Sequence, residues 1–376
     1  MYNSPMRGIS CTIRQKTLII SSATPLKVLT SAVLNPELRE ADTIINHQVT
    51  RDFDERSPQR YMRNIAEKLH LNPAKTVGLM TAVDVRNHVA KTLRERGIEV
   101  TAIVTGGVSN PATAGDDLTH TPVGTINIVV LTNAKLVGGS MVNAVQTATE
   151  AKTVALHALD VRSRFSKRAA SGTTSDAVVV GSTQRGEATT YAGTATCLGK
   201  LIGKTVSEAV RDAITKDMEF KQRMALKKRL EEYGIRFDDL VKTWRQLYIH
   251  HPSMGKLKDV ENLVAENLEN ALSDCNVASL VLAGLRLEED GASGLIPGLG
   301  KTTSRDDPVS LVADELLGLA IADYLAGSRG IFEFYRFDRL KPGLLKKLGP
   351  FADDVIGGLV SGVSSSVYTQ ILSKRR

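Results

Sequence analysis

The feature that most constrains the fold is a change of pattern near the middle of the 376-residue chain. Before it, short β-branched apolar runs alternate with longer helical runs. Residues 216–232 are densely charged and helix-prone, and strand signals almost vanish after them. The sequence therefore predicts two domains, residues 1–218 and residues 230–376, joined by a charged helical linker at residues 219–229.

The N-terminal part is predicted to be a mixed α/β (α+β) domain. Five runs predict strands: 17–20, 76–83, 99–107, 125–132 and 176–182. Four segments predict helices: 60–71, 85–96, 139–159 and 198–217. Several strands are apolar on both faces, which is typical of a sheet that is covered on both sides. Gly97 is expected to end the helix that precedes the third strand, and the strand order stays open.

The C-terminal part is predicted to be an all-α domain. Five segments predict helices: 237–248, 257–272, 277–288, 309–326 and 353–372. A Gly-rich loop is expected at residues 290–305.

Three acidic clusters mark the C-terminal part: SRDDPVSLVADELLG (304–318), YRFDRLKPG (335–343) and FADDVIGG (351–358). Asp307 followed by Pro308 predicts a helix start, which would place Asp314 two turns further on the same face. Gly318 and Gly358 continue such faces, so packing of the two helices there would bring carboxylates together. Carboxylates in contact repel one another unless they are protonated or bridged by a cation. The clusters therefore predict a site for a hard divalent ion such as Mg²⁺, with solvated helix starts as the alternative.

Two polar loops follow or precede strands of the N-terminal part, VTGGVSNPATAGDD (104–117) and AASGTTSDAVVV (169–180). Loops of this kind carry function more often than cores do. They supply six candidate site residues: Ser109, Asn110, Asp116, Thr173, Thr174 and Asp176.

One helical stripe in the same part carries Asn143, Glu150 and His157, spaced seven residues apart. It lies opposite the apolar face of the predicted helix. An acid/base strip beside a pocket and the solvated side of an amphipathic helix are equally good interpretations.

Composition excludes several classes of protein. The three cysteines are far apart, which predicts neither zinc site nor disulfide framework and favours a cytoplasmic protein. No uninterrupted apolar stretch reaches 18 residues, so no membrane span is expected. The net charge of +7 is modest, and no basic face interleaved with aromatic residues indicates nucleic acid binding. Formation of a homo-oligomer stays open.

Residues from about 7 to 214 resemble the adenosylcobinamide amidohydrolase family. The resemblance rests on VTGGVSNPATAGDD, GTINIVVLTN, TATEAKTVAL, SGTTSDAVVV and YAGTATCLGKLIG. It implies cleavage of the amide that joins aminopropanol to the corrin ring, which gives adenosylcobyric acid. A corrinoid-binding module without hydrolytic activity is the alternative.

Residues from about 230 to 372 resemble the phosphatidylglycerophosphatase A superfamily, on the three acidic clusters. That superfamily includes an archaeal α-ribazole-phosphate phosphatase. The chain lacks the spanning segments of the lipid-acting members, which favours a soluble substrate such as α-ribazole phosphate over a lipid phosphate. The whole chain is similar to archaeal bifunctional enzymes that serve cobamide salvage with both activities.

The two resemblances imply roles for the candidate residues. The expected ligands of Mg²⁺ (or Mn²⁺) are Asp307, Asp314, Glu315 and Asp354. Asp338 or Asp353 would complete this site or act as a base, and Lys341 would bind the phosphate. The candidate bases for amide cleavage are Asp116, Glu150 and Asp176. The candidate nucleophiles or substrate-binding residues are Ser109, Asn110, Thr173 and Thr174, with the Gly106–Gly107 amides as oxyanion donors.

Overall fold

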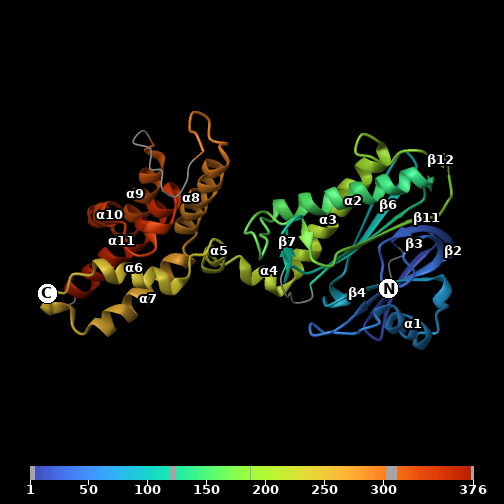
Figure 1. The fold of residues 1–376 in the computed structure, drawn as a ribbon, viewed down its shortest axis with the longest axis horizontal. Helices are drawn as coiled ribbons and strands as arrows, with labels where there is room; N and C mark the ends of the chain where they lie inside the picture. Colours follow the sequence, from blue (N-terminus) through green and yellow to red (C-terminus); the bar gives the residue numbers. More distant parts are fainter. Residues whose placement is uncertain (1–4, 119–123, 187, 302–310, 374–376) are drawn as a thin grey trace. The chain divides into compact units, whose positions relative to one another are not determined.

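The computed structural model describes residues 5–118, 124–186, 188–301 and 311–373. The chain forms two compact units, Met1–Gln222 and Arg223–Arg376. The first unit is mixed α/β around a sheet and the second is largely helical, as the sequence predicts (Figure 1).

The first unit is built on an eight-stranded sheet with the order β4-β3-β2-β11-β8-β6-β5, and β1 pairs with β2. Its strands are β1 (Ile9–Arg14), β2 (Thr17–Thr30), β3 (Glu37–Gln48), β4 (Thr76–Thr81), β5 (Val89–Glu95), β6 (Ile98–Gly106), β8 (Ile126–Thr132) and β11 (Ala177–Ser182). The pairs β3–β4 and β8–β11 are parallel, and the other pairs are antiparallel. Two small ladders join β7 (Pro111–Ala112) to β10 (Gly172–Thr173) and β9 (Lys135–Leu136) to β12 (Ala188–Thr189).

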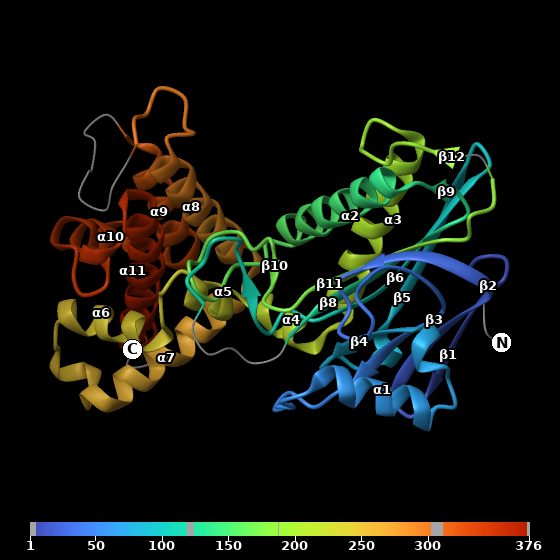
Figure 2. The same ribbon diagram turned by 45° about the vertical axis from the view of Figure 1, so that its right-hand side comes forward.

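This sheet curls, so that its two halves face each other. Ile44 on β3 and Val77 on β4 share one core with Ile103 on β6 and Val129 on β8. The outer face of β6, β8 and β11 packs against α2 (Gly138–Ala158) and α3 (Cys197–Lys216). The outer face of β2 and β3 packs against α1 (Pro58–Lys68). The first unit is therefore a four-layer α-β-β-α arrangement (Figures 1 and 2).

Most elements predicted for this unit are confirmed, with one clear error. All five predicted strands are present, and so are the helices predicted at residues 60–71, 139–159 and 198–217. Residues 85–96, predicted as a helix, contain the strand β5. Arg96 and Gly97 both have positive φ angles, 51° and 78°, as a tight hairpin turn between β5 and β6 requires. Gly97 is thus a turn residue and not the end of a helix, and β1 and β3 were not predicted.

The second unit is a bundle around its last helix, α11 (Pro350–Ser373), which contacts α7, α8, α9 and α10. The other helices are α5 (Leu226–Glu232), α6 (Phe237–Leu247), α7 (Leu257–Ser273), α8 (Cys275–Ser293), α9 (Ala313–Ala326) and α10 (Ser328–Leu340). The five predicted helices are confirmed, although the described part of α9 begins only at Ala313. Helix α10 was not predicted.

The charged segment forms two short helices, α4 (Met218–Arg223) and α5. Leu226 and Leu230 on α5 are buried in the core of the second unit. Arg223 and Glu232 pair at 2.5 Å between their side chains. The second half of the expected linker is therefore an amphipathic part of the helical unit.

Among the described residues, α11 alone is long and apolar enough on composition to cross a membrane. In the structure 67% of its most apolar window is buried within the protein. Burial of this kind is also what a central helix of a bundle shows.

Candidate active sites

The acidic site of the second unit is set by a contact between two glycines on α9 and α11. A Cβ atom on Gly358 would lie 2.2 Å from the carbonyl oxygen of Gly318. A Cβ atom on Gly318 would lie 2.6 Å from the carbonyl oxygen of Asp354. Any side chain at these positions would push the helices apart, so the two backbones touch only because both residues are glycines. This is the packing that the small-residue faces predict.

The contact brings three carboxylates together. Asp314 and Asp354 each lie one turn before one of these glycines, and Glu315 follows Asp314. One oxygen from each of the three side chains lies within 4.8 Å of the others. Asp314 and Asp354 are only 1% and 3% exposed. The predicted convergence of the first and third acidic clusters is therefore present.

The second cluster joins them through Lys341, which ends α10 in a left-handed conformation with φ 42°. Its Nζ atom lies 2.6 Å from Asp353, 3.0 Å from Asp338 and 3.5 Å from Asp354. Burial acts to lower the pKa of Lys341, but the carboxylates of Asp353, Asp354 and Asp338 outweigh it and hold that pKa above its usual value. The lysine is therefore the charged centre of the site.

One lysine does not balance the negative charge of this cluster. The hydrogen bond with Asp314, reinforced by burial, raises the pKa of Glu315 to about 7. Burial raises the pKa of Asp354 to about 8. The positive charge of Lys341 opposes this shift, and the carboxylate of Asp353 adds to it. Among the described residues, Asp314 Oδ2 and Glu315 Oε2 are buried without a hydrogen-bond partner. Unpartnered carboxylate oxygens around one point are the donor set that a hard divalent cation takes.

Asp307, the fourth expected ligand, lies outside the described residues. The expectation that it starts the helix of Asp314 needs correction, since α9 begins at Ala313 and the two residues before it are not helical. Asp314 is therefore in the first turn of its helix and not two turns along it.

Glu288 on α8 is a residue of this region that sequence reasoning missed. Its Oε2 atom accepts hydrogen bonds from the backbone N–H groups of Phe351 and Ala352 at 3.0 and 3.1 Å. Burial raises the pKa of this carboxyl group, while the two N–H groups oppose the shift. Glu288 thus caps α11 just before Asp353 and Asp354, from a helix that carries no local signal for this role.

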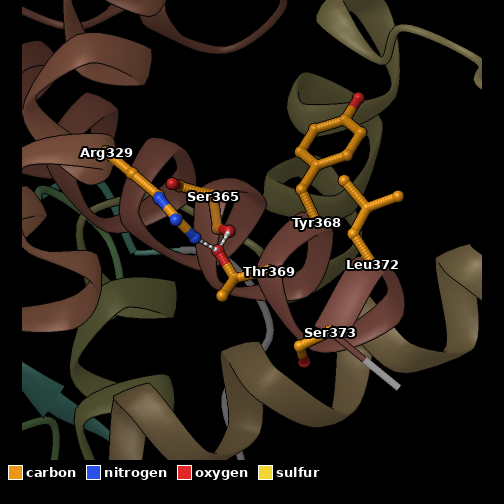
Figure 3. A pocket seen from close by; sticks show the side chains of 6 residues that line it. All are labelled: Arg329, Ser365, Tyr368, Thr369, Leu372 and Ser373. Atoms are coloured by element: carbon orange, nitrogen blue, oxygen red, sulfur yellow. Dashed lines mark hydrogen bonds between the residues drawn. The ribbon is translucent and has the colours of Figure 1, made fainter. Parts of the chain in front are cut away.

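The helical unit also has an open hollow of about 350 Å³ lined by Arg329, Ser365, Tyr368, Thr369, Leu372 and Ser373 (Figure 3). Arg329 donates a hydrogen bond to Thr369 Oγ1 at 3.2 Å. On α11, Ser365 lies about three turns, or roughly 16 Å, from Asp354. The hollow is therefore separate from the acidic site.

In the first unit, the two predicted polar loops do meet. Asn110 is fully buried and donates a hydrogen bond to Thr174 Oγ1. Thr173 donates to Asp176 through its hydroxyl and through its backbone N–H, the latter at 3.0 Å. The side chains of Ser109 and Asn110 both lie against Gly124. A Cβ atom on Gly124 would lie 2.4 Å from Ser109 Oγ and 2.3 Å from Asn110 Oδ1.

Asp176 is an anchor of this cluster. Beyond the two bonds from Thr173, it accepts hydrogen bonds from Ile126 N at 2.9 Å and from Lys152 Nζ at 2.5 Å. The Lys152 and Asp176 side chains are 9% and 11% exposed. These partners tie the Asp176 carboxylate into the structure around the loop, which favours a supporting role over the expected role as a base.

Asp116 is likewise saturated. It accepts hydrogen bonds from Thr113 N at 2.7 Å, Ser163 Oγ at 2.5 Å and Arg168 at 3.0 Å. Burial acts to raise the pKa of Asp116, but the hydrogen bonds from Ser163 and the other donors outweigh it and hold that pKa well below its usual range. These hydrogen bonds favour the role of a loop anchor for Asp116 over the expected role as a base.

Glu150 lies away from the cluster. It is exposed on α2, as is His157, while Asn143 bonds Gln146 at 3.2 Å. The opposite, buried side of α2 carries Lys152. The geometry favours the solvated-face interpretation of the stripe, and sequence reasoning missed Lys152 because its neighbours are Ala and Thr residues that mark neither face clearly.

A cavity of about 270 Å³ opens in the first unit beside Ser109. Its lining includes Arg51, Asp84, Gly106, Gly107 and Asp217. Gly106 and Gly107 thus lie at a cavity wall, but the N–H group of Gly107 already donates to Thr125 O at 3.2 Å, which disfavours its expected role as an oxyanion donor.

A buried polar network lies between the two halves of the sheet. Asn46 donates to Thr105 Oγ1 at 2.8 Å. Asn127 donates to Asn46 Oδ1 at 3.0 Å and to Met80 O at 2.8 Å. Nothing in the local sequence of these three strands indicated that their polar side chains would meet.

Comparison with known proteins gives matches for both units. Residues 3–222 match the family model described as adenosylcobinamide amidohydrolase, and residues 260–368 match the one described as phosphatidylglycerophosphatase A. An adenosylcobinamide amidohydrolase of Methanosarcina mazei is 31% identical over 208 residues, which are 53% of this chain and 94% of the relative. An uncharacterized protein of Methanocaldococcus jannaschii is 35% identical over 113 residues, or 29% of this chain and 86% of the relative.

A solved structure, the low temperature requirement C protein from Listeria monocytogenes, is 26% identical with a TM-score of 0.33. The match covers 39% of this chain and 93% of that protein. The first family model spans more than half of the chain, and the second lies within the helical unit. The chain therefore belongs to the adenosylcobinamide amidohydrolase family and carries a phosphatidylglycerophosphatase A domain at its C-terminal end.

Proposed function

We propose that the protein hydrolyses two cobamide precursors. The first unit would cleave the aminopropanol amide of adenosylcobinamide, giving adenosylcobyric acid. The second would release phosphate from α-ribazole phosphate, the phosphorylated nucleoside of the lower cobamide ligand. Family membership supports the first activity. The carboxylate cluster around Lys341 is the observation that carries the second.

For phosphate release, Asp314, Glu315 and Asp354 would hold Mg²⁺ or Mn²⁺. When bound, the cation supplies neutralisation of phosphate oxygens and a more acidic bound water. Asp353 lies beside Lys341 and can hold a proton at its carboxylate during the reaction. Lys341 supplies a fixed positive charge where the phosphate dianion would enter.

A lipid phosphate is the second candidate substrate, and one observation favours it. Leu316 follows Glu315, and Leu340 precedes Lys341, and both are largely exposed. Phe332 on α10 is 75% exposed and Tyr335 follows it one turn later. Apolar side chains beside a phosphate site can contact acyl chains.

The deciding experiment measures phosphate release from α-ribazole phosphate and from phosphatidylglycerophosphate by the intact protein in Mg²⁺. We expect faster turnover of α-ribazole phosphate and aminopropanol release from adenosylcobinamide in a parallel assay. Turnover of the lipid alone would replace the substrate proposed for the second unit. Corrinoid binding without aminopropanol release would make the first unit a binding module.

A further inference from the structure

We propose that the cavity beside Ser109 is the catalytic site of the first unit and receives the aminopropanol amide of the corrinoid. Asp217 acts there as the general base, and Ser109 donates a hydrogen bond to the amide carbonyl oxygen. This inference rests on the amide cleavage proposed above. It places that reaction at the cavity and not at Asp116 or Asp176.

The cavity lies where several elements end together. Asp84 lies just after β4, and Asp217 is the C-cap residue of α3. Gly106 is the last residue of β6, and Gly107 comes directly after it. A Cβ atom on Gly107 would lie 2.7 Å from Val83 Cγ2 and 3.3 Å from Asp217 Oδ2. The bare backbone at Gly107 therefore leaves open the space in front of the Asp217 carboxylate.

Ser109 is held on the same cavity by its neighbours. Arg164 donates a hydrogen bond to Ser109 O at 2.7 Å, and Asn110 is locked to Thr174. Gly124, which also lines the cavity, leaves room for the Ser109 hydroxyl. The saturated cluster around Asp176 thus acts as the support of the loop that presents Ser109.

A buried polar network lies next to the residues that line the cavity. Thr105 directly precedes Gly106, and Asn46 lies two residues before Gln48, another lining residue on the same face of β3. Buried amides between two apolar sheet layers are costly unless they are satisfied. The hydrogen bonds of Asn46 to Thr105 and of Asn127 to Asn46 satisfy them and fix the strands that carry the cavity.

Size and charge both fit the reaction. About 270 Å³ admits the aminopropanol arm and its amide, while the corrin ring stays outside. Hydrolysis of an amide produces a carboxylate and an ammonium group. The lining carries groups of both signs, a guanidinium at Arg51 and carboxylates at Asp84 and Asp217, and Asp84 is also paired with Arg86 at 2.5 Å.

The step balances with water as the only co-reactant. The water oxygen bonds to the amide carbon as one of its protons passes to the Asp217 carboxylate. The C–N bond then breaks as Asp217 returns that proton to the nitrogen, which leaves as aminopropanol. Ser109 stabilises the negative charge on the carbonyl oxygen between these events. The corrinoid acid finally loses a proton to solvent.

The test measures aminopropanol release from adenosylcobinamide by the full chain. We expect Asp217→Asn to lower kcat by at least about a hundredfold and Ser109→Ala to lower it by about a hundredfold. Formate should restore part of the activity of Asp217→Ala, which a merely structural loss would not allow. The Glu67→Gln variant, at an exposed position on α1, is the matched carboxylate control and should keep wild-type kcat. Thermal denaturation monitored on the first unit reports folding of each variant, and phosphate release by the second unit reports the amount of intact chain in each sample.

The outcomes separate this inference from the proposed function. A wild-type protein that releases no aminopropanol refutes amide cleavage itself. An active wild type with unchanged Asp217→Asn and Ser109→Ala kcat overturns the cavity assignment alone. If Asp217→Asn does not fold, the Ser109→Ala kcat decides. A large loss in Glu150→Gln would move the site to the outer side of α2.

Discussion

Both units bury carboxylates, but they surround them differently. Asp116 and Asp176 in the first unit accept hydrogen bonds from backbone N–H groups, hydroxyls and basic side chains. Asp314 and Glu315 in the second unit face other carboxylates, and each leaves a buried oxygen without a hydrogen bond among the described residues. A saturated carboxylate supports the fold, whereas carboxylates with surplus oxygens in contact must take up protons or a cation.

The largest effect should come from removing a saturated carboxylate. Asp176→Asn leaves Lys152 buried without its partner, so we expect a loss of about 3–5 kcal/mol in the free energy of unfolding. Urea denaturation of the full chain, monitored on the first unit, measures it. Glu150→Gln on the same layer should change that free energy little. A loss below about 1 kcal/mol would mean that the Lys152–Asp176 pair is not a support of the fold.

Removing a carboxylate from the unsaturated cluster should instead affect chemistry. We expect Asp314→Asn to lower phosphate release by about a hundredfold or more, because loss of an outer-shell partner alone costs up to about a hundredfold. Chelation of the wild type should do the same. Asp323→Asn, on the exposed side of α9, is the matched control. Wild-type turnover by Asp314→Asn in saturating Mg²⁺ would leave the cluster as a set of helix starts.

The pH dependence of stability tests whether the hydrogen bonds to Asp116 stabilise the fold. Its folded pKa lies below the unfolded value, so its stabilising contribution is present above about pH 4 and is lost as the pH falls towards the folded pKa. Asp116→Asn should cost about 2 kcal/mol near neutral pH, the scale of hydrogen bonds to a charged group. Denaturation curves at pH 7 and pH 3 should differ less for the variant than for the wild type. Equal differences would argue against the anchor role.

The smallest change is expected for Asp354→Asn without metal. Because burial and neighbouring carboxylates raise the pKa of Asp354 to about 8, the amide replaces a group that is mostly uncharged at neutral pH. The free energy of unfolding should change by no more than about 1 kcal/mol. Added Mg²⁺ should then raise the melting temperature of the wild type but not of the variant. A strong destabilisation of the metal-free variant would show that this carboxylate is saturated after all.

The sequence predicted the acidic site better than the amidohydrolase site, for a physical reason. On α9 and α11 each carboxylate and its glycine lie one helical turn apart, so the spacing itself encodes the geometry. Glu288, which caps α11 from another helix, shows the limit of that reasoning.

In the first unit the relevant partners are separated by long stretches of chain. Asn46 meets Thr105 and Asn127 only because the sheet curls and sets three strands in register. The polar loops are recognisable in the sequence, but the hydrogen bonds that Asp116 and Asp176 accept are not. The strand β5 was missed because its pattern is compatible with a helix until the turn at Arg96 and Gly97 is known.

The contact between Gly318 and Gly358 has a consequence for the choice of ion. The helices meet there through their backbones, which have no rotamers to change. The separation between the backbones of Asp314 and Asp354 is therefore set more firmly than a contact through side chains could set it. Mg²⁺ binds oxygen at about 2.0–2.1 Å, whereas Ca²⁺ needs about 2.3–2.6 Å and more ligands. Helices that pack this closely would therefore suit the smaller ion better than the larger one, although both carry the same charge.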